Sequence, residues 1–401
     1  MSARPPVRDW ATDFDHFNLQ WVEDPFPIWD DLRRRCPVAH STRYEDGAYF
    51  ASRYDDVREI AYDSEHFSSR RVIVREQKIP VVPSPPITSD PPEHTPARKV
   101  LLPAFTPQAI AKLKPRARAV CRELLERIGG AASCDGAIDY AQHIPVRVIA
   151  HMLDLPEADG DRFRDWIHRI LEIGPTNPQV AMQTLEELTR YFHGHVEARR
   201  ARPGDDLISF LIAARMDGQP LSQPNLLGML RLLLIAGIDT TWSGIGASLW
   251  HLATHPEDRC RLAADASLMP TAIEEFLRAY APVTMAREVV KETSVGGCTF
   301  KEKAQVLLSF PAANRDPAMF PDPDRVIIER AENRHAAFGL GRHRCLGSNL
   351  ARMEMTVAIE EWLARFPDFR LADGARVKWS EGTVRGPRRL PFVLGTARNP
   401  V

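Results

Sequence analysis

The chain of 401 residues lacks an excess of either charge, a disulfide framework and a long apolar run. Lysine and arginine number 52 and aspartate and glutamate 53, so the formal net charge of -1 predicts no global attraction to nucleic acid or to an anionic membrane. The six cysteines include no CxxC pair. This argues against a zinc ribbon and is typical of a reducing, cytoplasmic compartment.

Neither a membrane anchor nor an export signal is expected. The N-terminal residues reach Asp9 and Asp13 without an apolar stretch, which argues against a signal peptide. The longest apolar run lies near residues 232–238 and ends at Asp239. It is therefore far shorter than the roughly 18 apolar residues that a bilayer span needs.

Apolar periodicity predicts a mainly α chain with a minor β part. Helical spacing covers residues 107–128, 161–173, 179–200 and 205–216. Short β-like segments occupy residues 48–51, 295–300, 305–310 and 390–394. Prolines cluster in residues 80–96 and 311–323, so both stretches should be irregular. With no clear linker, we expect a single domain over residues 1–401.

A longer helix is predicted for residues 224–255, about 48 Å at ~1.5 Å per residue. Its first half is apolar almost all round, which is typical of a buried helix. It contains Gly237, which costs roughly 1 kcal/mol relative to alanine. It also contains Asp239, and a buried carboxylate costs several kcal/mol unless it is paired or protonated. A structural role in the core and a functional role both remain open for these two residues.

One cysteine carries the strongest signal. Cys345 lies in a loop with three glycines and Phe338, just before an apolar helix that runs from Ser348 to Phe366. The thiol pKa should be lowered by the positive end of that helix and by three nearby basic residues, Arg342, His343 and Arg344. A lone thiolate on a glycine loop fits axial ligation of haem iron. The alternatives are a small buried side chain, or a nucleophile with His343 as its base.

The pattern Phe338-x-x-Gly341-x-x-x-Cys345-x-Gly347 resembles the haem-binding loop of the cytochrome P-450 monooxygenases. Four further segments resemble family motifs in the family order: Asp90-Pro91-Pro92-Glu93-His94-Thr95-x-x-Arg98, Ala236-Gly237-x-Asp239-Thr240-Thr241, Glu275-x-x-Arg278 and Asn314-Arg315-Asp316-Pro317 with Phe320–Arg325. The likeness covers roughly residues 20–395 and is closest to the soluble bacterial type. It implies the cytochrome P-450 fold, with the long central helix crossing over haem.

The resemblance implies haem b as the cofactor and Cys345 as the iron ligand. His94 and Arg98 are four residues apart, hence on one helix face, and match propionate-binding positions together with Arg287 and His343. The expected haem-binding residues are His94, Arg98, Ala236, Gly237, Arg287, Phe338, Gly339, His343, Cys345 and Gly347. A structural triad that braces the cysteine loop is expected from Glu275, Arg278 and Arg325.

The implied reaction inserts one atom of O₂ into a small, largely apolar substrate, by hydroxylation or O-dealkylation. Thr240 would hydrogen-bond oxygen, Asp239 would relay protons, and Gly237 would leave room for O₂. Electrons would come from a ferredoxin and its NAD(P)H-dependent reductase. The partner would dock on a basic face made by Lys112, Lys114, Arg116, Arg118, Arg342 and Arg344.

The resemblance also places a substrate pocket. Its expected residues are Val72, Ile73, Val74, Leu233, Ala236, Val283, Thr284, Met285, Thr383 and Val384. Three arginines before it, Arg70, Arg71 and Arg75, are candidates for recognising a carboxylate. Two other functions stay open: different chemistry on the same scaffold, such as desaturation, aryl coupling or peroxide use, and a non-catalytic haem sensor or carrier.

Overall fold

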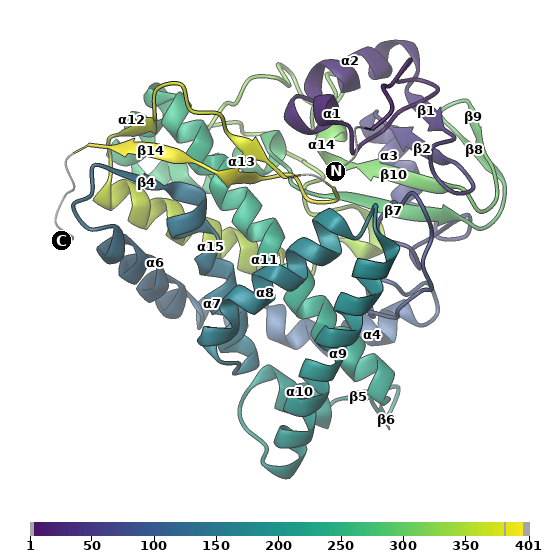
Figure 1. The fold of residues 1–401 in the computed structure, drawn as a ribbon, viewed down its shortest axis with the longest axis horizontal. Coiled ribbons are helices and arrows are strands. Elements are labelled where there is room, and N and C mark those ends of the chain that lie inside the picture. The colour runs from purple at the N-terminus through teal and green to yellow at the C-terminus, as the bar shows by residue number, and fades with distance from the viewer. Residues whose placement is uncertain (1–3, 381, 396–401) are drawn as a thin grey trace.

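The computed structural model of the chain describes residues 4–380 and 382–395. Helices fill the left and lower parts of the molecule in Figure 1, and a mixed sheet with short helices around it occupies the upper right. The prediction of a mainly α fold with a minor β part is confirmed.

The helices and strands have the following bounds. The α-helices are α1 (Leu19–Glu23), α2 (Phe26–Arg35), α3 (Tyr54–Tyr62), α4 (His94–Leu101), α5 (Pro107–Ala111), α6 (Lys114–Ile128), α7 (His143–Leu153), α8 (Gly160–His168), α9 (Pro178–Ala201), α10 (Leu207–Ala213), α11 (Gln223–Thr254), α12 (Pro256–Ala264), α13 (Met269–Ala279), α14 (Phe310–Ala313) and α15 (Ser348–Arg365). The strands are β1 (Val38–Ser41), β2 (Ala48–Ala51), β3 (Phe67–Ser68), β4 (Ser133–Asp135), β5 (Arg215–Met216), β6 (Gln219–Pro220), β7 (Thr284–Val289), β8 (Thr293–Val295), β9 (Cys298–Phe300), β10 (Gln305–Ser309), β11 (Phe369–Leu371), β12 (Lys378–Trp379), β13 (Pro387–Arg389) and β14 (Pro391–Leu394).

Helix α11 is the central element of the helical part. The hydroxyl of Ser222 accepts a hydrogen bond from the N–H of Asn225 and caps the helix, and Pro224 lies in the first turn, where no N–H is needed. The helix ends just before Pro256 and packs against α7, α9 and α15. It is long and apolar enough to cross a membrane by length and composition alone, but 67% of its most apolar window is buried inside the protein. That burial is typical of a core helix.

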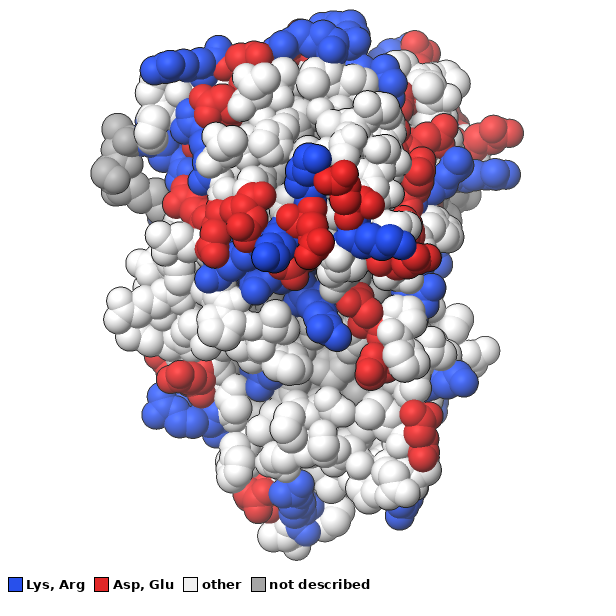
Figure 2. All heavy atoms as spheres, turned by 90° about the vertical axis from the view of Figure 1, so that its right-hand side faces the viewer, with Lys and Arg blue, Asp and Glu red and all other residues white. Residues whose placement is uncertain are grey.

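The main sheet has the strand order β1-β2-β10-β7-β3. Strand β10 is parallel to β2 and antiparallel to β7, so Leu307 lies opposite both Phe50 and Ala286. These three side chains are buried in a cluster that also contains Trp21 and Trp29. On the face shown in Figure 2, positive and negative side chains lie next to one another across the middle of the molecule, in keeping with the balanced net charge.

Three predicted helices differ from the observed ones. The segment 205–216 is helical only as α10, and Arg215 and Met216 at its end form strand β5. Residues 107–128 form α5 and α6 rather than one helix, because Pro115 lacks an N–H and its ring would clash with a carbonyl of a continuous helix. Residues 161–173 are α-helical only to His168 and continue as a π-helical turn, Arg169–Ile173. The central helix matches its prediction to within one residue at each end.

Candidate active site

The cysteine loop joins the irregular stretch after α14 to the start of α15. The N–H of Cys345 donates to the carbonyl of Phe338 (2.7 Å) and closes the loop on itself. Gly339 and Gly341 have φ angles of +73° and +68°, which favour glycine. A Cβ on Gly341 would also lie 2.6 Å from the carbonyl oxygen of Ala61. The loop can therefore take this path only with glycine at that position.

Cys345 keeps part of its surface exposed, but protein atoms closely surround its sulfur. Burial of its sulfur by the surrounding protein raises the pKa of Cys345, and the Gly347 N–H and the guanidinium of Arg98 act in the opposite direction. The expectation that local cations lower the thiol pKa is therefore wrong for the free thiol, because desolvation outweighs them. A coordinating metal ion deprotonates a thiol by itself.

A largely apolar cavity of about 240 Å³ lies between α11 and the cysteine loop. It is bounded by the loop on one side and by the middle of α11 on the other, and its described lining is Pro86, Ile87, Arg98, Leu101, Phe105, Ile149, Leu232, Leu233, Ala236, Gly237, Thr240, Thr241, Leu277, Pro282, Val283, Met285, Arg287, Phe310, Ala337, Phe338, Gly339, Leu340, His343, Cys345, Leu346, Gly347, Leu350, Ala351 and Met355. All the predicted haem-binding residues except His94 are in this lining.

His94 lies directly beside this cavity, against His343. The two rings lie edge to face with their centroids 4.4 Å apart. Both ring nitrogens of His94 and Nε2 of His343 are buried without a hydrogen-bond partner. Burial lowers the pKa of both imidazoles, that of His343 to about 2. Arg287 is also buried, with no carboxylate within ion-pair distance among the described residues, and its guanidinium donates only to the carbonyl of Ala286. Burial lowers the pKa of Arg287 to about 10.

These unpartnered donors match a flat ligand that carries two carboxylates. Unpaired buried cations and orphaned ring nitrogens are costly unless an anion meets them. Haem has such carboxylates in its propionates, an apolar ring for the cavity and an iron for one thiolate. The residues present therefore fit haem, with Cys345 as the iron ligand and His94, Arg98, Arg287 and His343 at the propionates. No group of three or more His, Cys, Asp or Glu in the described part of the chain is placed to hold a bare metal ion.

Asp239 faces away from the cavity into an ion-pair cluster. Its carboxylate is 1% exposed and lies 2.8 and 3.0 Å from the guanidinium nitrogens of Arg388 on β13. Arg388 also pairs with Glu172 (2.8 Å), which lies 3.5 Å from the half-exposed His168. Burial raises the pKa of Asp239, and Arg388 opposes that shift. The sequence offered no signal for Arg388, Glu172 or His168, because they meet Asp239 only in the folded chain.

The neighbours of Asp239 on α11 occupy different environments. Thr240 lines the cavity, and its hydroxyl donates to the carbonyl of Ala236 (2.9 Å). A Cβ on Gly237 would lie 2.7 Å from Cδ1 of Ile149. Glycine at this position therefore allows α7 to pack closely on α11, which supports the structural role that the sequence left open for Gly237.

Six predicted pocket residues are absent from the cavity lining. Strand pairing explains four of them: the carbonyls of Val72 and Thr383 accept from strand residues Ala286 and Thr284, and Val384 bridges to Val283. Val74 packs in the core beneath the sheet, and Ile73 packs on the helical core. The other four predicted pocket residues are in the cavity lining: Leu233, Ala236, Val283 and Met285.

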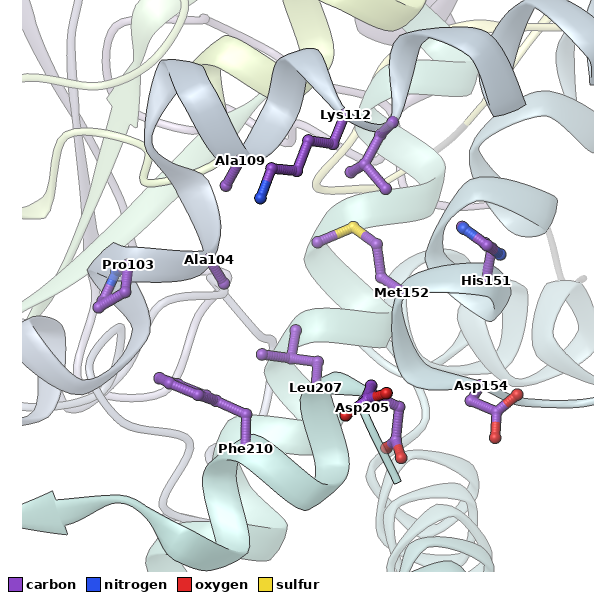
Figure 3. A pocket seen from close by; sticks show the side chains of 12 residues that line it. Pro103, Ala104, Ala109, Lys112, His151, Met152, Asp154, Asp205, Leu207 and Phe210 are labelled. Atoms are coloured by element: carbon purple, nitrogen blue, oxygen red, sulfur yellow. The ribbon is translucent and has the colours of Figure 1, made fainter. Parts of the chain in front are cut away.

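A second cleft of about 780 Å³ opens at the surface between α5, α7 and α10 (Figure 3). Two of its acidic side chains are already engaged. Asp206 caps α10 through the N–H groups of Ile208 and Ser209, and Asp154 pairs with Arg199 (2.9 Å). Neither of these two carboxylates is therefore free to bind a ligand.

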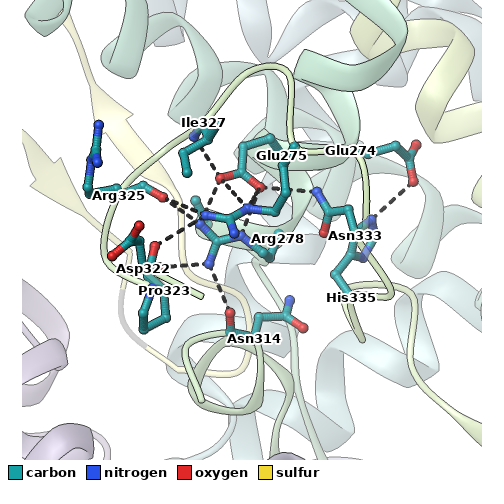
Figure 4. A network of polar contacts seen from close by, with 12 residues as sticks. Glu274, Glu275, Arg278, Asn314, Asp322, Pro323, Arg325, Ile327, Asn333 and His335 are labelled. Atoms are coloured by element: carbon teal, nitrogen blue, oxygen red, sulfur yellow. Dashed lines mark hydrogen bonds and ion pairs between the residues drawn. The ribbon is translucent and has the colours of Figure 1, made fainter. Parts of the chain in front are cut away.

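A buried polar network fixes the stretch before the cysteine loop (Figure 4). The carboxylate of Glu275 accepts from Arg278 (2.8 Å), Arg330 (3.0 Å) and the N–H of Ile327 (2.8 Å). Arg325 contributes only its backbone carbonyl, which accepts from Arg278 (2.9 Å). The expected triad is thus wrong in its third member, because the irregular backbone brings Arg330 rather than Arg325 to Glu275.

Comparisons with known proteins agree with this geometry. The model of the family Cytochrome P450 matches residues 163–381. The chain is 35% identical to a mycinamicin IV hydroxylase/epoxidase of Micromonospora griseorubida, over 91% of this chain and 94% of that one. It is 36% identical to a vitamin D(3) 25-hydroxylase of Pseudonocardia autotrophica, over 95% and 96%. A crystal structure of CYP109E1 from Bacillus megaterium in complex with testosterone superposes with a TM-score of 0.86 at 31% identity, covering 92% of this chain and 98% of that one.

Proposed function

The chain belongs to the cytochrome P450 family, and on that premise we propose that it hydroxylates or O-dealkylates a largely apolar organic molecule with electrons from a ferredoxin and its reductase. Members of this family are haem-dependent monooxygenases that use O₂. The observation that carries the proposal is the apolar cavity, which has Cys345 on one wall and Thr240 on the opposite one.

The chain's own residues have separable tasks. Haem, when bound, supplies the activation of O₂ and the transfer of one oxygen atom to the substrate. Cys345 holds the iron, and the unpaired groups on α4, β7 and the cysteine loop hold the propionates. Gly347 lies close to Cys345, and its N–H faces the sulfur.

Thr240 and Asp239 act on protons. The Thr240 hydroxyl already uses its hydrogen toward Ala236, so its oxygen is free to accept a hydrogen bond inside the cavity. Asp239 is held by Arg388 and has almost no contact with solvent. Its carboxylate must separate from Arg388 before it can pass a proton toward Thr240.

The substrate class follows from the lining. Aliphatic and proline side chains dominate the wall around α11, including Leu233, Val283 and Met285. Such a surface binds molecules with extensive apolar area. Mycinamicin IV, vitamin D(3) and testosterone, named for the relatives, are bulky examples of this class.

The electron donor is expected on the face that carries the cysteine loop. Arg342 and Arg344 are exposed, and no carboxylate among the described residues lies within ion-pair distance of either. Arg116 and Arg118 of the predicted basic face are instead paired with Glu157 and with Glu360 and Glu361. We therefore place an acidic ferredoxin on the loop arginines, in a cytoplasmic setting.

The decisive experiment is spectroscopic. The holoprotein, reduced and exposed to CO, should show the strongly red-shifted Soret band of thiolate-ligated haem, and Cys345→Ser should lose it. With a ferredoxin system, NAD(P)H and apolar test compounds, hydroxylated or dealkylated products should form. An unaltered spectrum in Cys345→Ser refutes the assignment of the ligand. Products from peroxide alone refute the proposed electron supply.

A further inference from the structure

Residues 69–93 run from β3 to α4 without helix or strand, on the right of Figure 1. They carry Pro86 and Ile87 into the cavity lining. Their many prolines lack N–H donors, so few internal hydrogen bonds hold the segment, and a turn at residues 84–89 contains most of them. We call residues 79–87, the part of this stretch that includes Pro86 and Ile87, the roof segment. Its position must therefore be set by contacts from other elements.

One of these contacts comes from α11. A guanidinium nitrogen of Arg231 donates to the carbonyl of Pro83 (2.7 Å), and the other terminal nitrogen donates to the hydroxyl of Thr189 on α9 (3.0 Å). At the same place Gly228 brings the helix close to the segment, since a Cβ there would lie 2.5 Å from the carbonyl oxygen of Pro83. One arginine thus joins the roof segment, α9 and α11.

Arg231 is a buried cation with neutral partners only. Its side chain is 5% exposed, its Nε has no hydrogen-bond partner, and no carboxylate among the described residues lies within ion-pair distance. Burial lowers the pKa of Arg231. A hydrogen bond from a charged group is stronger than one between neutral groups, but a buried charge without a counter-ion loses its solvation by water. Desolvation of Arg231 therefore opposes the contacts that it makes.

A second buried arginine also donates to a backbone carbonyl, near the start of residues 69–93. Arg75 is buried, donates to the carbonyl of Gly174 after the π-helical turn, and has no carboxylate partner among the described residues. Arg71, which precedes Arg75 in the same stretch, does pair with a carboxylate, that of Glu288 (3.2 Å). Arg231 and Arg75, which have no carboxylate partner among the described residues, are thus the arginines that connect residues 69–93 to α11 and to the turn before α9.

We propose that Arg231 is a positioning residue that closes the roof over the substrate cavity, with Arg75 as a second clasp. By holding Pro83 it sets where Pro86 and Ile87 lie above the bound substrate. Opening of the roof segment breaks the contacts of Arg231 and Arg75, and water then solvates both guanidinium groups. The geometry of the roof stands on the structure alone, whereas the effect on substrate rests on the proposed function.

The test measures the roof directly, by amide hydrogen exchange of the holoprotein in a peptide covering residues 79–90. Arg231→Met keeps side-chain volume but removes the donors, and should raise exchange of this peptide about tenfold. Arg231→Lys should give an intermediate value. The matched control is Arg70→Met. Among the described residues this exposed arginine makes only a long surface ion pair with Asp90 (3.8 Å), at the end of the peptide, so its loss should leave exchange of residues 79–87 unaltered. A peptide from α6 reports general destabilisation.

Substrate access is read with 4-phenylimidazole as the probe. Its dissociation rate should rise about tenfold in Arg231→Met and in Arg75→Met at unchanged haem content. Unchanged exchange at residues 79–90, or an equal rise in α6, overturns the proposal. Faster roof exchange with unchanged probe dissociation also overturns it. Failure of the proposed function would appear separately, as a protein without haem absorbance, and would leave the exchange result intact.

Discussion

Two buried carboxylates, Glu275 on α13 and Asp239 on α11, show how similar ion pairs serve different purposes. Each is at most 1% exposed and each faces arginine. Glu275 accepts from Arg278, Arg330, Asn333 and the N–H of Ile327. Among the described residues Asp239 meets only Arg388, and Arg388 is shared with Glu172. A fully satisfied network is rigid, whereas a carboxylate with one shared partner can change partners at small cost.

Breaking the saturated network should have the largest effect. Glu275→Ala leaves Arg278 and Arg330 buried without a counter-ion, which costs about 3–5 kcal/mol. We expect little folded holoprotein, or a large drop in the urea midpoint and in haem retention. Arg325→Ala is the matched control, because its side chain lies outside the network, and it should change stability by less than about 0.5 kcal/mol. A large effect of Arg325→Ala would restore Arg325 to the triad.

Removing the single partner of Asp239 should change turnover more than folding. In Arg388→Met the carboxylate loses the charge that keeps its pKa from rising further. Product formation should fall roughly 10²-fold at neutral pH, at unchanged haem content, with electrons diverted to peroxide. Thr240→Ala should divert electrons in the same way but keep the wild-type pH dependence of turnover. Full coupling in Arg388→Met would contradict a positioning role.

The same variant has a stability signature with a definite sign. The fold raises the pKa of Asp239 above its ordinary value of 3.8, so it favours the neutral carboxyl. The corresponding stability is fully present below that value and is lost as pH rises through the folded pKa. Arg388→Met should therefore lose stability more steeply than the wild type as pH rises from below 3.8 toward neutrality. Urea unfolding of the holoprotein across this range measures the difference.

The sequence predicted the elements whose signals are local. The central helix could be predicted from its apolar run and from Ser222 and Pro256 at its ends. The cysteine loop could be predicted from its glycines, because the backbone path of this loop requires that residue type. Arg388 was not predictable, because it lies 149 residues from Asp239 and the pair exists only through tertiary packing. Arg330 was missed because irregular backbone has no period from which a facing residue can be inferred.

The comparison extends to a third buried carboxyl group, which has no hydrogen-bond partner among the described residues. Glu354 on α15 is fully buried, and neither carboxylate oxygen has a hydrogen-bond partner among the described residues. Burial raises the pKa of Glu354 well above its ordinary value of 4.5, so the folded protein holds it neutral. Its stability contribution is present at low pH and declines as pH rises. Glu354→Gln, which is neutral at every pH, should match the wild type near pH 5 and exceed it by about 1 kcal/mol near pH 8. Equal pH dependence of both proteins in urea unfolding would show that Glu354 is ionised and paired.

The smallest effect is expected from charged side chains that have no ion-pair partner in the part of the chain that the structure describes. Arg342 and Arg344 lie exposed beside Cys345, so their contribution to folding is near zero and their interaction with an acidic ferredoxin is screened by salt. Replacing both with glutamine should slow reduction by the ferredoxin severalfold at low ionic strength, and the difference from the wild type should shrink as salt is added, with the urea midpoint unchanged. Arg118→Gln serves as the control: its guanidinium already pairs with Glu360 and Glu361, so its loss should affect folding slightly and reduction hardly at all. Reduction kinetics that are identical in all three proteins at low salt would move the electron donor to another face of the molecule.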